Sequence, residues 1–271
     1  MVALETSIVG QGLPAPHNLR AALGCEAAIR EAGAVPATVA VLDGRLKVGL
    51  GESDLERIAE DSVKVSSRDL GPTIARGGAG ATTVAATVRA AWMAGIRFMA
   101  TGGIGGVHRG HPEDQSADLV ELAYSAVAVF CAGAKIILDL RLTLERLESL
   151  SVPVLGYGVD EFPAFYTRLS GCRVSARVDG AMEASRALRA VWDTRGSGVV
   201  VAVPPPRELE GADDLARQAV SELGDVSGAD VTPRLLARIA ELSDGRSLDL
   251  NVELVVHNAR TAAEVAAAYF S

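Results

Sequence analysis

The sequence predicts a protein of the α/β class, with a largely parallel central sheet covered by helices on both faces. Short runs of β-branched and apolar residues alternate with segments of helical length, as is typical of βαβ units. The composition, 49% hydrophobic and 22% charged, is that of a globular protein, and 271 residues can bury a large core. Because no composition break, long linker, repeat or low-complexity segment interrupts this pattern, we expect a single domain over residues 1–271.

The first part of the chain is expected to hold a hairpin, flanking strands and helices. Asp43-Gly44 lies between two β-branched runs and favours a two-residue hairpin turn. Asn18 is a candidate N-cap for the first helix, and Gly33 follows its end. In order, we expect a strand over 2–9, a helix over 18–31, two strands within 35–50, a short helix capped by Ser53, a strand over 62–66 and, after a loop over 77–83, a helix from 84 that ends at Gly95.

The rest of the chain repeats the alternation of strand and helix. The expected elements are a strand over 97–100, a helix from 116, strands over 127–130 and 152–155 separated by a helix from about 136, a helix over 182–192, a strand over 199–203 stopped by three prolines, and helices from about 214, from about 232 and over 251–269. Ligands of parallel sheets gather at the carboxyl ends of the strands. The loops that follow strands are therefore the places to look for chemistry.

Charge and cysteine content exclude several classes of protein. The formal net charge is −8 and the pI is near 5.1, which disfavours nucleic acid or an anionic membrane as the main partner. Cys25, Cys131 and Cys172 form no metal-ligating pair and are odd in number, as expected of reduced thiols. The first residues lack the features of a secretory signal, and the apolar stretch over 123–134 is too short for a membrane span. We expect a cytoplasmic protein that acts on a small molecule.

Lysine is unusually rare. Of the 26 basic residues only Lys47, Lys64 and Lys135 are lysines, and the others are arginines. A lysine that persists in such a sequence is a candidate for chemistry that needs a primary amine, because a guanidinium cannot lose its proton and attack a carbonyl. Chance survival of any one lysine is the alternative.

A glycine-rich loop over 101–110 follows the strand expected over 97–100. Five glycines in this loop would let the backbone approach a ligand and point amides at an anion. His108 and Arg109 lie within it, so it matches neither a Walker loop nor a dinucleotide-binding fingerprint. A flexible turn is the alternative interpretation.

The next segment, over 111–118, is acidic and leads into a helix. Ser116 is a natural N-cap, and a helix start offers free amides to a phosphate. Asp114 and Asp118 carry the oxygen ligands that Mg²⁺ or Mn²⁺ prefers. A solvated acidic loop with a capping serine explains the same residues without a ligand.

Two further residues are candidates for catalysis. Lys135 follows an apolar strand, where partial desolvation would favour a Schiff-base nucleophile. Glu5 lies between apolar residues of the first strand, where its pKa would be raised and it could act as a general acid. The alternatives are a lysine bound to a nearby carboxylate and an edge-strand glutamate that faces water.

Taken in order, a set of sequence blocks resembles the pseudouridine-5′-phosphate glycosidase family. The blocks cover essentially the whole chain, and the long glycine-rich block is the most specific of them. They are Ala3-Leu4-Glu5-Thr6-Ser7, Ala34-Val35-Pro36-Ala37-Thr38, Gly80-Ala81-Thr82-Thr83-Val84, the segment over 100–110, Ser116-Ala117-Asp118-Leu119, Cys131-Ala132-Gly133-Ala134-Lys135, Pro163-Ala164-Phe165-Tyr166, Val231-Thr232-Pro233 and Asn258-Ala259.

The resemblance implies a three-layer α/β/α fold, a homotrimer and reversible cleavage of the carbon–carbon bond between ribose 5-phosphate and uracil. It implies that Lys135 is the nucleophile, Glu5 the proton donor and Asp114 the ligand of a divalent ion, typically Mn²⁺. The residues that it implies in substrate binding, or in lining the site, are Lys64, Val84, Ser116, Ala117, Asp118, Thr101, His108 and Asn258.

The sequence departs from the family pattern around the first loop and the acidic loop. Thr6-Ser7 replaces Ser-Thr, Gln11 stands where relatives carry histidine, Gly71 replaces proline, and the loop between Gly110 and Ser116 is shorter. These departures raise the alternative of a C-glycosynthase that joins ribose 5-phosphate to an acceptor other than uracil. A phosphosugar-binding protein without catalysis is a second alternative, which the joint presence of the catalytic residue types argues against.

Overall fold

The computed structural model of the protein describes residues 1–223 and 231–271. Its central sheet has the strand order β12-β11-β13-β9-β6-β1-β2-β5-β4, and β3 pairs with β2. Neighbouring strands are parallel except where β2 pairs with β3 and with β5. The strands of this sheet are β1 (Val2–Leu4), β2 (Pro36–Leu42), β3 (Arg45–Val48), β4 (Val63–Val65), β5 (Gly80–Thr82), β6 (Phe98–Ala100), β9 (Ala128–Cys131), β11 (Val154–Tyr157), β12 (Ala176–Val178) and β13 (Val199–Ala202).

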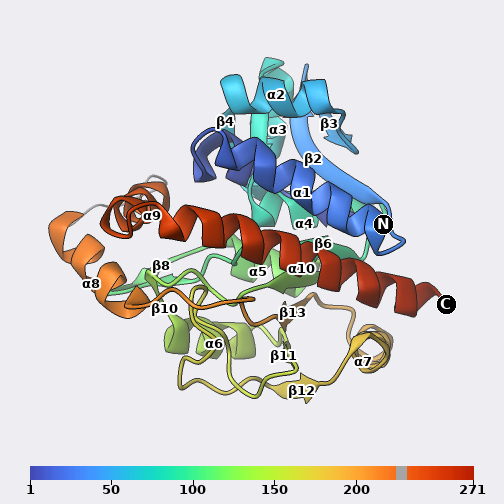
Figure 1. The fold of residues 1–271 in the computed structure, drawn as a ribbon. Helices are drawn as coiled ribbons and strands as arrows, with labels where there is room; N and C mark the ends of the chain where they lie inside the picture. Colours follow the sequence, from blue (N-terminus) through green and yellow to red (C-terminus); the bar gives the residue numbers. More distant parts are fainter. Residues whose placement is uncertain (224–230) are drawn as a thin grey trace.

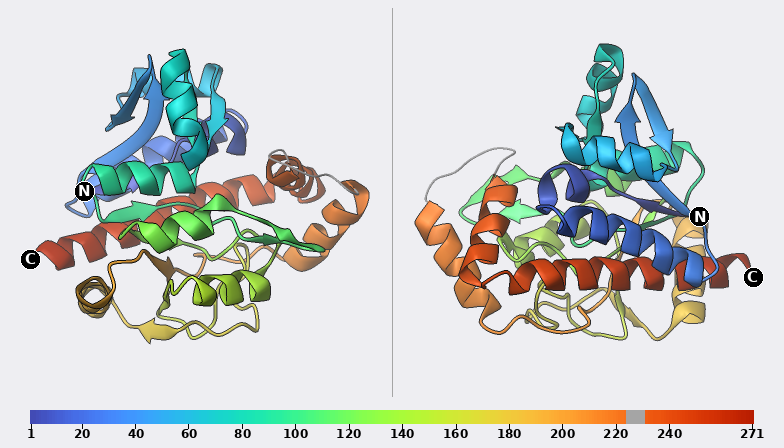
Figure 2. Two further views of the ribbon diagram at one scale, coloured as in Figure 1. Left: turned by 180° about the vertical axis from the view of Figure 1, so that it is seen from behind. Right: turned by 45° about the horizontal axis from the view of Figure 1, so that its top comes forward.

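Helices cover both faces of this sheet, which confirms the predicted fold class (Figure 1). The long C-terminal helix α10 packs against α1 and α7 on one face. The view from behind shows α4, α5 and α6 on the opposite face (Figure 2). The helices are α1 (His17–Glu31), α2 (Glu52–Glu60), α3 (Leu70–Arg76), α4 (Val84–Met93), α5 (Ala117–Tyr124), α6 (Leu140–Ser149), α7 (Ala181–Thr194), α8 (Ala212–Leu223), α9 (Val231–Leu242) and α10 (Arg246–Phe270), with a π-helix η1 (Ile8–Gly12) and a 3₁₀ turn η2 (Ser67–Asp69).

The strands at the middle of the sheet are buried along their whole length. Every residue of β1, β6, β9 and β13 is buried, as expected of parallel strands with helices on both faces. The predicted hairpin is confirmed: β2 and β3 pair through Asp43 and Gly44, whose φ angles of 52° and 68° are those of a type I′ turn. Within the described residues, no helix is both long and apolar enough to cross a bilayer.

A second, smaller sheet was not predicted. The strands β7 (Val107–His108), β8 (His111–Gln115) and β10 (Leu138–Asp139) form an antiparallel sheet in the order β10-β7-β8. The acidic loop is therefore part of a hairpin. The pairing also moves the start of the next helix from the predicted position near 136 to Leu140, because Leu138 and Asp139 pair with β7 before Asp139 caps α6.

Three predictions for the N-terminal region are wrong in detail. The first strand ends at Leu4 instead of residue 9, since the Thr6 hydroxyl donates to Val39 O and the chain turns into η1. Asn18 lies inside α1, where its side chain donates to Val9 O at 3.1 Å instead of capping the helix. Gly51, and not Ser53, precedes α2. Three-residue strands and single-turn geometry leave too little periodicity to locate such boundaries.

Three further elements, α3, β5 and β12, had no counterpart in the prediction. The strand β5 lies within the segment expected as a loop over 77–83, where it pairs with β2 and β4. Gly71 and Pro72 lie in the first turn of α3 and look like helix breakers in the sequence. Proline is tolerated in the first turn, because the amides there have no intrahelical acceptor. Among the described residues, the edge strand β12 pairs with β11 alone and is exposed at its first two residues, so it lacks an apolar run.

Candidate functional site

The ends of three adjacent parallel strands bring the predicted catalytic residues together. The strands β1, β6 and β9 are neighbours in the sheet, and their carboxyl ends meet at one edge. Glu5 follows β1, Thr101 follows β6, and Lys135 lies on the loop after β9. A cavity of about 450 Å³ opens at this edge. It is lined by all but one of the residues predicted for the site, namely Glu5, Lys64, Val84, Thr101, His108, Asp114, Ser116, Ala117, Asp118 and Lys135.

Glu5 is held at the cavity wall by two hydroxyl groups. The Thr101 hydroxyl donates to Glu5 Oε1 and the Ser7 hydroxyl donates to Oε2. Burial raises the pKa of Glu5, and the positive charge of Lys135 opposes this shift. The Ser-for-Thr exchange at position 7 keeps the hydroxyl that Glu5 needs, while Thr6 donates to Val39 O at 2.7 Å. A carboxyl with a raised pKa at a strand end can donate a proton near neutral pH.

Lys135 presents an amine without a fixed partner. Its side chain is half-buried in the cavity wall, and in the described part of the chain no hydrogen bond or ion pair holds Nζ. The alternative of a lysine paired with a carboxylate is therefore not what the structure shows. The backbone around it is fixed: the Lys135 N–H donates to Ile104 O, and the Arg109 guanidinium donates to the carbonyls of Ile136 and Leu138. The backbone of the loop is therefore fixed by hydrogen bonds, while no described residue holds the amine.

The loop that carries Lys135 is docked on the segment over 162–166. Gly133 has a φ of +81°, and a Cβ atom there would lie 1.8 Å from Pro163 O, so only glycine fits. The Phe165 N–H donates to Ala132 O at 2.9 Å. The Phe165 side chain lines the same cavity as Lys135.

The glycines of the 101–110 loop serve close packing of side chains against the backbone. A Cβ on Gly105 would lie 2.3 Å from Ser116 Oγ, and one on Gly106 would lie 2.3 Å from Thr143 Oγ1. A Cβ on Gly103 would lie 2.6 Å from Phe165. The loop is therefore not a flexible turn, and binding an anion through its backbone amides would not be its only role. The guanidinium of Arg109, within the same loop, holds the backbone carbonyls of Ile136 and Leu138.

Asp118 joins two helix starts to this loop. It is 6% exposed, and its two carboxylate oxygens accept hydrogen bonds from the N–H groups of Ala85, at 2.9 Å, and Gly105, at 2.8 Å. These bonds engage both oxygens in holding the protein together, so Asp118 is a more constrained candidate for a metal ligand than Asp114. Ser116 caps α5 as predicted, its hydroxyl accepting from the Asp118 N–H at 3.2 Å. The start of α5 faces the cavity with the positive end of its dipole.

Asp114 is the less constrained candidate for a metal ligand. It lies on β8, half-buried in the cavity lining. Within the two described stretches, no group of three or more His, Cys, Asp or Glu side chains could hold an ion. A divalent ion that keeps several waters needs only one or two protein carboxylates plus substrate oxygens. Asp114 fits an ion held in that way and does not fit a permanent site with several protein ligands.

Asn258 is the one predicted site residue that does not line the cavity. It is fully buried on α10, and its side chain donates to Thr101 O at 2.8 Å and to Gly102 O at 3.3 Å. It thereby fixes the backbone of the residue whose hydroxyl holds Glu5. Asn258 is a positioning residue in this structure.

The cavity also contains residues that sequence analysis did not assign to the site. Asn251, Phe165 and Leu236 line it, and Gln11 appeared only as a departure from the family pattern. Asn251 and Asn258 lie seven positions apart on α10, a spacing that places them on one face of the helix. The helix predicted over 251–269 contains both residues, so this spacing was the available signal.

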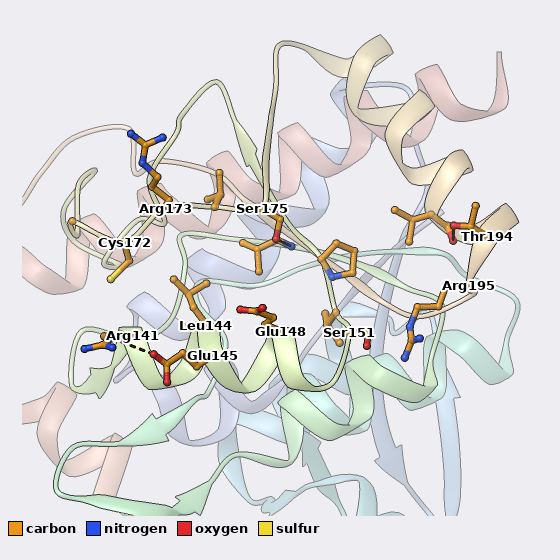
Figure 3. Close-up of a pocket in the computed structure, with 16 residues that line it drawn as sticks. Arg141, Leu144, Glu145, Glu148, Ser151, Cys172, Arg173, Ser175, Thr194 and Arg195 are labelled. Atoms are coloured by element: carbon orange, nitrogen blue, oxygen red, sulfur yellow. Dashed lines mark hydrogen bonds and ion pairs between the residues drawn. The ribbon is translucent and has the colours of Figure 1, made fainter.

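A larger surface hollow of about 830 Å³ lies away from these strand ends (Figure 3). It lies beside α6 and α7, and Arg141, Glu145, Cys172, Arg173 and Arg195 are among its lining. Arg141 and Glu145, on adjacent turns of α6, form an exposed ion pair at its side. None of the predicted site residues reaches it. The smaller cavity at the strand ends is the candidate active site.

Comparison with known proteins identifies related sequences and structures. The family model described as indigoidine synthase A like protein matches residues 1–268. Pseudouridine-5′-phosphate glycosidase of Deinococcus radiodurans is 51% identical over 99% of this chain and 90% of its own. The protein of that name from Hahella chejuensis is 49% identical over 100% of this chain and 93% of its own.

Two solved structures share the fold closely. An indigoidine synthase A-like protein from Thermotoga maritima superposes with a TM-score of 0.92 and is 33% identical, covering 98% of this chain and 91% of that one. The prealnumycin C-glycosynthase AlnA, solved in complex with ribulose 5-phosphate, gives a TM-score of 0.90 at 38% identity, covering 99% and 91%.

Proposed function

We propose, from the premise that this chain belongs to the pseudouridine-5′-phosphate glycosidase family, that it breaks or forms the C–C bond between ribose 5-phosphate and a carbon-linked base. The protein is an enzyme of the C-glycosidase or C-glycosynthase type. The observation that carries the proposal is the meeting of Glu5 and Lys135 in one cavity, with the Lys135 amine unengaged among the described residues. A phosphosugar substrate agrees with the ribulose 5-phosphate held by the related C-glycosynthase.

In the synthetic direction, the Lys135 amine condenses with the aldehyde of open-chain ribose 5-phosphate to give an imine, and water leaves. A nucleophilic ring carbon of the base attacks the imine carbon, so that a C–C bond forms and the electron pair of the C=N bond moves to nitrogen. The ring carbon then loses its proton. The sugar 4′-hydroxyl closes on the former imine carbon and displaces the lysine amine. Cleavage is the reverse sequence.

Glu5 exchanges protons during these steps. In cleavage, its protonated form donates to the base carbon as the C–C bond breaks, and in synthesis the carboxylate takes that proton back. Burial raises the pKa of Glu5, which favours its acid form. Thr101 and Ser7 hold the carboxyl in place through their hydroxyls.

The phosphate of the substrate is assigned to the groups around the start of α5. The Ala117 N–H and the Ser116 hydroxyl can donate to it at this helix end, Asp118 holds the helix start against the glycine-rich loop, and Lys64 of β4 adds a positive charge at the cavity wall. Val84 begins α4 beside them. His108 of β7 lines the cavity near the sugar and can exchange hydrogen bonds with its hydroxyls.

A divalent ion, with Mn²⁺ as the first choice, is part of the proposal. Asp114 would hold it through one carboxylate, with waters and substrate oxygens completing the coordination. When bound, the ion would neutralise negative charge on the phosphosugar.

The homotrimer implied by the resemblance is also part of the proposal. Trp92 and Met93 on α4 and Val120 and Tyr124 on α5 are exposed apolar side chains, and the two helices pack side by side. Exposed apolar side chains on two neighbouring helices are candidates for a surface that another subunit covers. Light scattering measures the mass in solution, and a monomer mass contradicts this part of the proposal.

The imine is tested by reduction. Wild-type protein is incubated with ribose 5-phosphate and borohydride, and the peptide that contains Lys135 is analysed by mass spectrometry. A sugar phosphate adduct on Lys135 supports an enzyme that forms an imine. No adduct on any lysine contradicts the mechanism and favours a binding protein without catalysis.

A C-glycosynthase with an acceptor other than uracil is the second candidate. The likeness to AlnA and the glutamine at position 11 favour it. In this case the protein cleaves pseudouridine 5′-phosphate weakly and reacts better with another carbon nucleophile plus ribose 5-phosphate. Gln11→His would shift its preference toward uracil. A panel of bases read by mass spectrometry decides, and efficient wild-type cleavage that Gln11→His does not improve contradicts this candidate.

A further inference from the structure

Lys135 lies at the first position of a tight turn. The Leu138 N–H donates to Lys135 O at 2.9 Å, which closes a β-turn over 135–138. On the amino side of this turn, the Lys135 N–H donates to Ile104 O at 3.2 Å, so the chain is fixed up to that point. The direction of the Lys135 side chain therefore depends on what holds the carboxyl side of the turn.

Arg109 holds that side. Its Nε donates to Leu138 O at 3.0 Å and its Nη2 donates to Ile136 O at 2.8 Å, so one planar guanidinium binds two carbonyl groups of the turn. Ile136 and Leu138 are each 1% exposed, so water cannot replace the guanidinium at these carbonyls. A buried carbonyl that loses its donor lowers the stability of its conformation. The conformation of the turn therefore depends on a forked donor.

The strand pairing next to the turn does not supply this support. In the second sheet, β10 pairs with β7 at Leu138 and Asp139, and this pairing does not include Ile136. Arg109 follows β7 in the hairpin formed by β7 and β8, whose residues His108 and Asp114 line the cavity. Its side chain thus crosses from the hairpin to the turn that begins at the nucleophile.

Arg141 lies in the same stretch of chain and shows what is particular to Arg109. It is on the first turn of α6, and its Nε donates to Glu145 Oε1 at 3.2 Å on the next turn of that helix (Figure 3). Within the described residues, neither arginine bonds to the partner of the other, and Arg109 forms no ion pair. Arg141 is therefore a matched control: its loss removes the same charge but no contact to the turn.

We propose that Arg109 is a positioning residue for the nucleophile, because its guanidinium fixes the turn over 135–138 and thereby the direction in which the Lys135 amine enters the cavity. The inference rests on the proposed function for the role of Lys135. A displacement of about 1 Å at a reacting group can cost about a hundredfold in rate. Lysine is not an adequate substitute, because an ammonium is a point donor and the two carbonyls accept from two nitrogens of one plane.

Labelling of the lysines tests the position of the amine without turnover. Reductive methylation with ¹³C-formaldehyde gives one NMR signal for each of the three lysines, and the signal missing from Lys135→Arg is that of Lys135. We expect Arg109→Ala to change the chemical shift of the Lys135 signal and its pH titration, while the Lys47 signal stays unchanged. Arg141→Ala should change neither signal. An unchanged Lys135 signal in Arg109→Ala overturns the proposal.

The rate of imine trapping tests the consequence for the chemistry. Each protein is incubated with saturating ribose 5-phosphate and borohydride below its thermal midpoint, and the adduct on Lys135 is followed with time. We expect the rate to fall roughly tenfold to a hundredfold in Arg109→Ala and in Arg109→Lys, and to stay at the wild-type value in Arg141→Ala. A wild-type rate in Arg109→Lys would show that positive charge suffices, and it overturns the proposal.

Chemical rescue distinguishes positioning from a general loss of stability. Arg109 is exposed, so added ethylguanidinium can reach the space that Arg109→Ala leaves. It should restore part of the trapping rate in Arg109→Ala and leave the rates of wild type and Arg141→Ala unchanged. A lower thermal midpoint in Arg109→Ala with a wild-type trapping rate would assign Arg109 a structural role alone and overturns the proposal.

The outcomes separate this inference from the proposed function. An adduct that forms at the wild-type rate in both Arg109 variants leaves the function standing and refutes the positioning role. A changed Lys135 signal in Arg109→Ala, with no adduct in wild type, supports the positioning of the amine and refutes the proposed imine.

Discussion

The parallel middle of the sheet and its periphery contribute to the site in different ways. Glu5, Thr101 and Lys135 follow strands β1, β6 and β9, every residue of which is buried. Lys64 and Asp114 come from β4 and β8, whose residues are mostly exposed. The residues proposed for the covalent chemistry therefore follow the most buried strands, and those proposed to contact the phosphosugar and a metal ion lie on parts that can change without disturbing the core.

Lys135→Arg should have the largest effect on activity, because it removes the proposed nucleophile at the buried strand ends and changes nothing at the periphery of the sheet. A guanidinium keeps the positive charge but cannot form an imine, so we expect turnover to fall by roughly a thousandfold or more, with the fold unchanged. Initial rates with pseudouridine 5′-phosphate measure the loss, and the thermal midpoint checks the fold. Activity close to that of wild type would contradict the assignment of Lys135.

Glu5→Gln should have the next largest effect, about a hundredfold to ten-thousandfold on kcat, as for loss of a general acid. Burial raises the pKa of Glu5 in the folded protein, so wild-type activity should fall as the pH rises through that raised pKa. Stability should follow the same direction: it is present at low pH and is lost as the folded carboxyl gives up its proton. Rate and urea unfolding measured against pH should both lose this dependence in the variant.

Asp118→Asn tests a connection within the site, because the Asp118 carboxylate bonds both to the start of α4 and to the glycine-rich loop after β6. An amide has one acceptor oxygen, so one of the N–H groups of Ala85 and Gly105 would face an NH₂ group instead. We expect the free energy of unfolding to fall by about 1–3 kcal/mol. Asp139→Asn is the control, because Asp139 accepts from only one N–H, that of Leu142, and Asn caps helices as well as Asp. Equal stability of the two variants would contradict the bridging role.

Asp114→Ala should have the smallest effect on stability, within about 0.5 kcal/mol, because it removes a half-buried side chain outside the core. Its effect should appear in the response to Mn²⁺: activity restored by the metal in chelator-treated wild type should not be restored in the variant. Full activity of chelator-treated wild type would refute the metal role whatever the variant does.

The regions also differ in how far the sequence predicts them. The apolar runs of β9 and β13 make the parallel core predictable, because burial on both faces demands continuous apolar residues. The single lysine after β9 makes Lys135 a candidate nucleophile from the sequence. The small antiparallel sheet and η1 could not be predicted, since two- and five-residue elements depend on partners far away in the chain. The hydrogen bonds from Arg109 to the carbonyls of Ile136 and Leu138 join segments that are separate in the chain and are invisible without the fold.

The docking of the Lys135 loop on the 162–166 segment limits how new acceptor specificities can evolve. Gly133 allows no other residue against Pro163 O, and the Phe165 N–H bonds to Ala132 O. An insertion or deletion near Phe165 would therefore shift Lys135 together with the part of the cavity wall that Phe165 forms. The π-helix that carries Gln11 has no such bond to the nucleophile loop among the described residues. Diversification of the accepted ring should therefore accumulate in η1, while the 162–166 segment should tolerate changes of side chain but not of length.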